Sequence, residues 1–161
     1  MPKTSYLLVS LLCFFLLGAA LFLQLVGLNG VHYPPCPLCI LQRIGFLLVG
    51  IFCLFAYLFP KIRLSFHLLA IVATLFGLIV ALRHAYVIAY PEISCGLDPL
   101  EVFINQFEIV KALPFFFRAD GFCSMPLPPI LGLSVPSWSL IWFLLLLALF
   151  SYSVFNRKKV P

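Results

Sequence analysis

The sequence predicts an all-α integral membrane protein: a bundle of four transmembrane helices with a short amphipathic surface helix in its second outer loop. Hydrophobic residues make up 64% of the 161 residues and charged residues only 9%, whereas a soluble domain has about 45–50% and about 25%. The sequence also contains four apolar runs near the roughly 20 residues that cross a bilayer. These observations argue against a soluble domain, a disordered tail and a nucleic-acid-binding module. The net charge of +5 indicates no nucleic-acid partner.

The four predicted spans are apolar on all faces, so helical periodicity does not identify their buried sides. They cover residues 6–28, 40–59, 65–82 and 138–155. Trp138 and Trp142 lie near one end of the last span, where interfacial aromatic anchors are found. Because the sequence has no internal repeat and no second soluble segment, we expect a single membrane domain over residues 1–161, in contact with the lipid bilayer.

The first apolar run could instead be a cleaved signal peptide, because Lys3 precedes it and residues 18–20 within it are small. The apolar core of a signal peptide is about 7–15 residues long. This run continues well past that length, which favours a transmembrane span.

The basic residues predict the orientation of the spans. One side of the predicted membrane carries most of them: Lys3, Lys61, Arg63, Arg157, Lys158 and Lys159. The other side carries all five acidic residues. Because basic residues near span ends favour the cytoplasm, we expect both termini to be cytoplasmic. Loops of about residues 29–39 and 83–137 then face outward.

The cysteines divide by predicted compartment. Cys13 and Cys53 fall inside spans, where a buried cysteine usually packs as a small hydrophobe. The other four lie in the outer loops, on the side where disulfides persist: Cys36, Cys39, Cys95 and Cys123. Four cysteines permit three pairings, and the sequence does not choose among them. Proximity favours Cys36 with Cys39, and Cys95 with Cys123.

The segment Cys36-Pro37-Leu38-Cys39 favours a reactive dithiol. A disulfide closing so small a loop adds little chain-entropy stabilisation. The segment opens the second span, and the proline is typical of a first helical turn. Backbone N–H groups at a helix start favour a thiolate. Arg43 follows Cys39 by four residues, so the guanidinium can lie on the same helix face and stabilise that thiolate.

Three other interpretations of this segment were compared. Attachment of haem requires a histidine after the second cysteine, where Ile40 stands. A zinc site would use a second closely spaced cysteine pair, and Arg43 is a poor neighbour for a cation. We therefore expect no metal. A purely structural disulfide stays open.

The second outer loop contains an amphipathic segment of about 14 residues. Its apolar positions recur at helical spacing and its polar ones lie opposite: Leu100, Phe103, Ile104, Phe107 and Val110 against Glu101, Asn105, Glu108 and Lys111. Such a segment is typical of a helix lying on the membrane surface. An exposed loop helix, or part of a partner interface, is the alternative.

His84 is the histidine best placed for chemistry. It follows Arg83 at the outer end of the third predicted span, near the level of Arg43. A polar group at a membrane boundary is more often an anchor than a ligand, so both roles stay open from the residues alone.

Together these residues resemble the DsbB family of quinone-linked thiol oxidases in the bacterial inner membrane. The similarity covers nearly the whole chain: four spans, the motif from Cys36 to Arg43, the two loop cysteines, His84 followed by Tyr90-Pro91, and residues 131–138. The DsbA–DsbB–quinone system keeps the periplasm oxidising. The resemblance therefore implies a DsbA-like periplasmic partner and ubiquinone or menaquinone as electron acceptor.

The resemblance also implies a relay. The partner attacks a Cys95–Cys123 disulfide at Cys95. Cys123 then attacks Cys36 and displaces Cys39 as a thiolate. Cys39 passes the electrons to quinone, which Cys39, Arg43 and His84 bind, in a site without a metal.

Two further function classes stay open. One is a non-enzymatic membrane scaffold braced by outer disulfides, and the other is a membrane carrier that runs reducing electrons outward. Arg43 beside the dithiol, and the lack of a membrane-embedded cysteine pair in the predicted arrangement, favour the oxidase.

Overall fold

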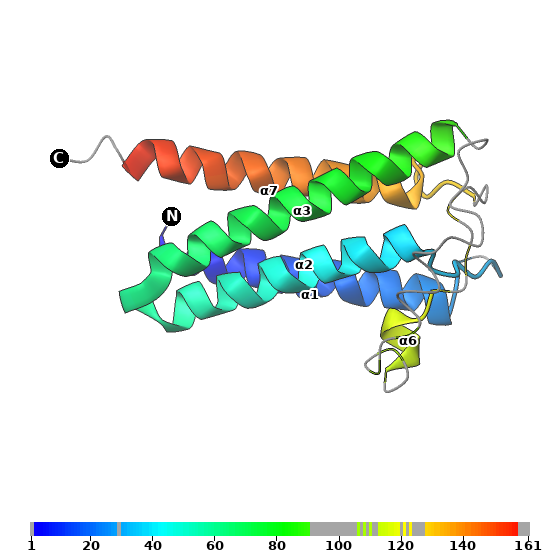
Figure 1. Ribbon diagram of the computed structural model, residues 1–161, viewed down its shortest axis with the longest axis horizontal. Helices are drawn as coiled ribbons and strands as arrows, with labels where there is room; N and C mark the ends of the chain where they lie inside the picture. The colour runs from blue at the N-terminus through cyan, green and yellow to red at the C-terminus, as the bar shows by residue number, and fades with distance from the viewer. Residues whose placement is uncertain are drawn as a thin grey trace.

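The computed structural model describes residues 2–28, 30–90, 106, 108, 110, 113–119, 121, 123 and 128–157. Four long helices dominate this part of the chain (Figure 1): α1 (Lys3–Leu25), α2 (Pro37–Leu58), α3 (Arg63–Ala89) and α7 (Val135–Arg157). A 3-10 turn, η1 (Pro60–Ile62), joins α2 to α3, and the short helix α6 (Pro114–Phe117) lies in the second loop. The described residues contain no strand, only two isolated bridges.

All four long helices are long and apolar enough to cross a membrane. The predicted fold class is therefore confirmed: the protein is a multi-pass, all-α membrane protein. Large apolar side chains face outward from the bundle, with Phe15 72%, Ile79 67% and Phe155 69% exposed. In a bilayer these side chains meet lipid tails, so they need no protein cover.

The third helix is longer than its predicted span of residues 65–82. It continues through Arg83 and His84 to Ala89, although these polar residues end the apolar run. His84 is buried inside the bundle, and the Arg83 guanidinium lies over the ring of Tyr86, 6.0 Å from its centroid. Both polar side chains are accommodated on a continuing helix, so the outer loop begins about two turns later than hydropathy predicts.

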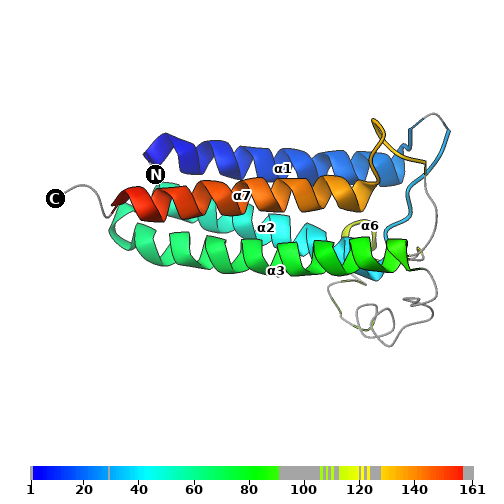
Figure 2. The ribbon, with the colours of Figure 1, turned by 90° about the horizontal axis from the view of Figure 1, so that it is seen from above.

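The helices pack in the order α1, α2, α3, α7. Contacts join α1 to α2, α2 to α3 and α3 to α7, whereas α1 and α7 are not closely packed on each other. Phe46 and Phe143 stack at 4.1 Å between ring centroids in the centre of the bundle. Gly77 makes room for this stack, because a Cβ there would lie 2.2 Å from the Phe143 ring. The two termini lie at the same end of the bundle (Figures 1 and 2).

A buried polar cluster lies near the end of the bundle that holds the termini. The Tyr6 hydroxyl is 3.1 Å from Nδ1 of His67, and both side chains are fully buried. The His67 ring also meets Phe150 edge-on at 5.4 Å. These contacts join α1, α3 and α7 at the end away from the loops.

At the other end, the second outer loop is attached to the first. The backbone N–H of Gly121 donates to the carbonyl of Pro35 at 3.0 Å, and the Tyr33 hydroxyl donates to the carbonyl of Pro128 at 3.3 Å. A Cβ on Gly121 would lie 2.5 Å from the Pro34 carbonyl oxygen. The close approach therefore requires glycine.

The predicted amphipathic helix lies mostly outside the described residues, as does Cys95. Within that segment Glu108 is exposed and Val110 is buried against Ile40 and Ala119. A helix lying on the membrane surface stays a prediction.

Candidate functional site

Cys36 and Cys39 form the start of α2. Cys36 is the N-cap residue, and its sulfur accepts a hydrogen bond from the backbone N–H of Cys39 at 3.3 Å. Pro37 occupies the first helical position, where a missing N–H has no cost. The two side chains are free thiols with their sulfurs 3.2 Å apart, and Cys36 donates toward Cys39. The helix start thus presents two sulfurs side by side.

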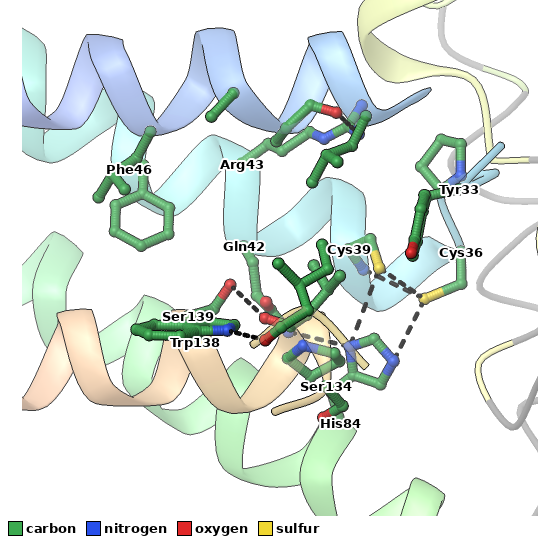
Figure 3. A pocket seen from close by; sticks show the side chains of 18 of the residues that line it. Tyr33, Cys36, Cys39, Gln42, Arg43, Phe46, His84, Ser134, Trp138 and Ser139 are labelled. Atoms are coloured by element: carbon green, nitrogen blue, oxygen red, sulfur yellow. Dashed lines mark hydrogen bonds between the residues drawn. The ribbon is translucent and has the colours of Figure 1, made fainter. Parts of the chain in front are cut away.

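His84 reaches these sulfurs from α3 (Figure 3). Its Nε2 lies 3.6 Å from Sγ of Cys36 and its Nδ1 lies 4.0 Å from Sγ of Cys39. The side chain is 2% exposed. Of the two roles left open for this residue, the structure favours direct contact with the dithiol over a boundary anchor.

Gln42 holds the imidazole of His84. The amide Nε2 of Gln42 is 3.0 Å from Nδ1 of His84, and the Gln42 side chain is buried. When this amide donates, the neutral imidazole carries its proton on Nε2, the nitrogen that faces Cys36. Gln42 was not among the predicted site residues. Its signal was a polar side chain at membrane depth, which is uncommon away from functional sites.

Arg43 lies on the same side of α2 as Cys39, as predicted, but its guanidinium is held by α1. Nη1 donates to Oε1 of Gln24 at 2.6 Å and Nη2 donates to the carbonyl of Ala20 at 3.3 Å. The charge interacts with the Cys39 and Cys36 sulfurs electrostatically. Gln24, which lies in the first predicted span, is a second contacting residue that was not predicted.

Cys123 approaches the pair from the second loop. It is buried, packs in one cluster with Cys36 and Val87, and forms a side-chain hydrogen bond with Cys36. Hydrogen bonding with Cys123, then with Cys39, together with burial, raises the pKa of the Cys36 thiol far above its usual range. Cys36 therefore stays protonated at neutral pH and can donate to the sulfur of Cys39.

A cavity of about 500 Å³ opens beside the dithiol. Residues of all four long helices and of both loops line it. Its polar end holds Cys36, Cys39, Gln42, Arg43, His84 and Cys123, and its apolar wall includes Phe15, Phe46, Ile88, Trp138 and Trp142. The Trp138 indole N–H donates to the carbonyl of Ile130 at 2.9 Å, which fixes this wall to the second loop. The exposed Phe15 and the weakly packed α1–α7 edge place the cavity next to lipid.

Five of the six predicted site residues therefore meet at one end of the bundle: Cys36, Cys39, Arg43, His84 and Cys123. The sixth, Cys95, lies outside the described residues.

Cys13 and Cys53 are fully buried far from this site, as packing residues would be. Both belong to the interface between α1 and α2. They interact electrostatically across the α1–α2 interface, where Ser10 donates to the carbonyl of Gly50 at 2.9 Å. Since Gly50 has no side chain, the helices approach closely there: a Cβ at Gly50 would lie 3.3 Å from the Cβ of Cys13. Helix packing thus brings Cys13 and Cys53 into one apolar core cluster, although they are distant in the sequence.

Comparison with known proteins agrees with this arrangement. The family described as disulfide bond formation protein DsbB matches residues 2–153. Disulfide bond formation protein B of Cupriavidus necator is 43% identical over 157 residues, covering 98% of this chain and 95% of the relative. The protein of the same name from Ralstonia nicotianae is 42% identical over 157 residues, covering 98% and 96%. Disulfide bond formation protein B 1 of Pseudomonas entomophila is 37% identical over 154 residues, covering 94% and 89%.

Proposed function

This chain belongs to the disulfide bond formation protein DsbB family, and on that premise we propose that it is a quinone-dependent protein thiol oxidase. In this role it reoxidises a DsbA-like, thioredoxin-fold oxidase of the periplasm. Membership in the family makes the chain a disulfide-generating membrane oxidoreductase. The quinone, the partner and the route of the electrons are the proposal.

The observation that carries the proposal is a dithiol that opens onto a lipid-facing cavity. Cys36 and Cys39 line the same cavity of about 500 Å³ as Arg43, His84 and an aromatic wall. Pockets of about 300–1,000 Å³ with a few convergent polar groups are typical of small-molecule sites. A quinone fits this donor set, since its ring is apolar and its carbonyl oxygens accept hydrogen bonds.

The site residues have distinct roles in the proposed reaction. A quinone, when bound, accepts two electrons and two protons. Cys39 supplies the sulfur that faces it, and Arg43 supplies a fixed positive charge that Gln24 and Ala20 hold in place. His84 holds a proton beside the sulfurs. Cys36 is the sulfur in contact with Cys123.

Electrons enter through the second loop. The reduced partner attacks the Cys95–Cys123 disulfide at Cys95, and the resulting mixed disulfide resolves as the partner becomes oxidised. The Cys123 sulfur attacks Cys36, which breaks the Cys36–Cys39 disulfide and leaves Cys39 as a thiolate. The Cys95 sulfur then attacks Cys123, which re-forms the Cys95–Cys123 disulfide and releases Cys36 as a thiol. The resulting Cys36–Cys39 dithiol would be reoxidised as its two electrons and two protons pass to a bound quinone. The contact between Cys123 and Cys36 supports this order of exchange.

The proposed topology follows from charge and from the site. Both termini lie at the end of the bundle opposite the dithiol. The basic residues flanking the spans favour a cytoplasmic location for that end. The site then faces the periplasm of a bacterial inner membrane, and residues 1–161 form one membrane domain.

The test is quinone reduction by the purified full-length protein, with a reduced DsbA-like dithiol protein as donor and ubiquinone or menaquinone as acceptor. We expect turnover in the parent and none in Cys39→Ala or Cys123→Ala. Cys13→Ala is the matched control and keeps turnover. If no quinone is reduced, while alkylation shows the outer cysteines locked in unreactive disulfides, the chain is a scaffold. Reduction of an outer disulfide substrate by the protein would instead indicate a reductant carrier.

A further inference from the structure

We propose that the reduced site also binds a thiophilic divalent cation, Zn²⁺, through Cys36, Cys39 and His84, and that Gln42 orients the histidine for this role. The binding itself does not depend on the proposed quinone chemistry. Its consequence, inhibition of the oxidase, does rest on the proposed function.

The donor atoms of these three residues lie close enough together to share one metal ion. One donor atom from each of the three residues fits within 4.8 Å of the other two. The sulfurs are 3.2 Å apart and Nε2 of His84 is 3.6 Å from Sγ of Cys36. A tetrahedral zinc ion at the usual bond lengths separates two sulfurs by about 3.8 Å and a sulfur from a nitrogen by about 3.5 Å. Forming the site requires the sulfurs to part by about 0.6 Å and the histidine nitrogen to approach both of them to about 3.5 Å, starting from donor atoms that already lie within 4.8 Å of one another.

The residue types also match those of known zinc sites. Two cysteines separated by two residues are half of a common zinc-binding pattern, and histidine is the usual companion of cysteine in such sites. Zinc was disfavoured from the sequence because a second closely spaced cysteine pair is lacking. The fold instead supplies His84 from α3 and brings Cys123 next to Cys36. Cys123 is therefore the candidate fourth ligand.

The charge around the donor atoms and the path to them also suit a divalent cation. Two thiolates neutralise a divalent cation, and the Arg43 guanidinium is directed to Gln24 and Ala20 of α1 rather than into the donor cluster (Figure 3). All three donor residues line the cavity. The cavity gives the ion a path to them.

The contact between Gln42 and His84 orients the imidazole for metal binding. Nδ1 of His84 is already engaged by Gln42 at 3.0 Å, which leaves Nε2 as the nitrogen for a metal. Rotation of the Gln42 amide by half a turn would present Oε1 to an N–H on Nδ1. A zinc-bound histidine commonly donates its other N–H to such an acceptor, which fixes the ring and strengthens the ligand.

The step involves no oxidation. Zn²⁺ forms bonds to the sulfurs of Cys36 and Cys39 and to Nε2 of His84, and two thiol protons leave to solvent. The proton on the neutral imidazole moves from Nε2 to Nδ1. A Cys36–Cys39 disulfide offers no thiolate, so only the reduced chain binds the ion. While bound, the ion keeps both thiols from forming a disulfide.

The experiment titrates the reduced, quinone-free, full-length protein with Cd²⁺ under anaerobic conditions and follows thiolate-to-metal absorbance, with Zn²⁺ as competitor. We expect one tightly bound ion per chain, displaced by Zn²⁺. Cys39→Ser should lose the tight site. Cys13→Ser is the matched control and should keep it, because Cys13 is buried elsewhere in the bundle.

Variants of Gln42 and His84 separate this site from a simple dithiol chelate. Gln42→Glu should tighten binding and Gln42→Leu should weaken it, each by about 10–100-fold. His84→Ala should weaken it at least as much as Gln42→Leu does. If the affinity for Cd²⁺ is unchanged by the substitutions at Gln42 and His84, or if the oxidised chain binds the ion equally well, the proposal is wrong. If the ion binds as expected while no quinone is reduced, the proposed function fails and the metal site stands.

Discussion

Helix α3 carries one buried histidine near each end, and the two do different things. His67 is fully buried and His84 is 2% exposed. His67 lies against the Tyr6 hydroxyl and meets the rings of Tyr6 and Phe150 edge-on. His84 meets an amide and two sulfurs and lines a cavity of about 500 Å³. Burial alone therefore does not distinguish the two histidines, whereas the adjacent cavity and the sulfur contacts of His84 do.

The cysteines repeat the contrast. Cys13 and Cys53 are fully buried in the main apolar core cluster with Phe46 and Phe143. Cys36 and Cys39 lie at a helix start beside the cavity, each within 4.0 Å of a His84 nitrogen. Cys36 and Cys39 are neighbours in the sequence, whereas Cys13 and Cys53 come from two helices that pack together. Only the second has a path for a ligand.

The largest expected effect compares His84→Ala with His67→Ala. Loss of a positioned proton-holding group costs about 10²–10⁴-fold in rate, so His84→Ala should lower quinone-dependent turnover by at least about 10²-fold while the bundle stays folded. His67→Ala removes the partner of the Tyr6 hydroxyl. It should lower the free energy of unfolding by about 1–3 kcal/mol and leave turnover per folded molecule within about twofold of the parent.

Turnover assays and denaturant unfolding in the same detergent measure both quantities. Equal losses of turnover for the two variants, normalised to folded protein, would remove the distinction between the two ends of α3.

The next effect concerns the protonation of Cys36. Hydrogen bonding with Cys123 is the largest cause of the raised pKa of Cys36. A raised pKa leaves little thiolate at neutral pH, and the thiolate is the form that reacts. Cys123→Ala should therefore lower this pKa and speed alkylation of reduced Cys36 at pH 8, by about tenfold for each pKa unit.

Peptide mass spectrometry of the alkylated protein identifies which cysteine reacts, and a pH series gives the pKa. Cys13→Ala should leave the Cys36 profile where it was. A Cys36 profile that does not move in Cys123→Ala would mean that the hydrogen bond with Cys39 and burial hold the thiol protonated without Cys123.

The smallest expected effect is at the membrane-embedded pair. Cys13→Ala and Cys53→Ala each remove one sulfur from a packed interface, and we expect turnover within about twofold of the parent with a modest loss of stability, about 1 kcal/mol. The same turnover and unfolding assays apply. Loss of turnover in either variant would bring these cysteines into the electron path and end the contrast between the two pairs.

Local signals were sufficient for much of the fold and for part of the site. Hydropathy alone predicts four spanning helices, because lipid exposure requires long apolar runs. The segment from Cys36 to Cys39 was recognisable as a helix start, because Pro37 and the cysteine spacing are local features. The end of α3 was not, since His84 is polar by composition and its burial depends on α2.

Contacts between helices could not be read from one apolar sequence. Each span is apolar all round, so nothing local indicated that Gln24 would accept from Arg43 or that Gln42 would hold His84. The packing of Cys13 and Cys53 in one core cluster of α1 and α2 was hidden for the same reason. Polar residues inside spans were the available signal, and here both glutamines proved to contact site residues.

The attachment of Gly121 to the first loop has a kinetic consequence. The N–H of Gly121 donates to the Pro35 carbonyl. Gly121 lies two residues before Cys123 in the second loop, and Pro35 directly precedes Cys36 in the first loop. In the proposed exchange, this tether would keep the Cys123 sulfur at a high effective molarity relative to Cys36, so their encounter would be first-order rather than a search by a long loop. A side chain at position 121 would disrupt this attachment, and it would lower the effective molarity of the Cys123 sulfur without contacting either sulfur. The residue that sets the local concentration in the exchange is thus one with no functional group.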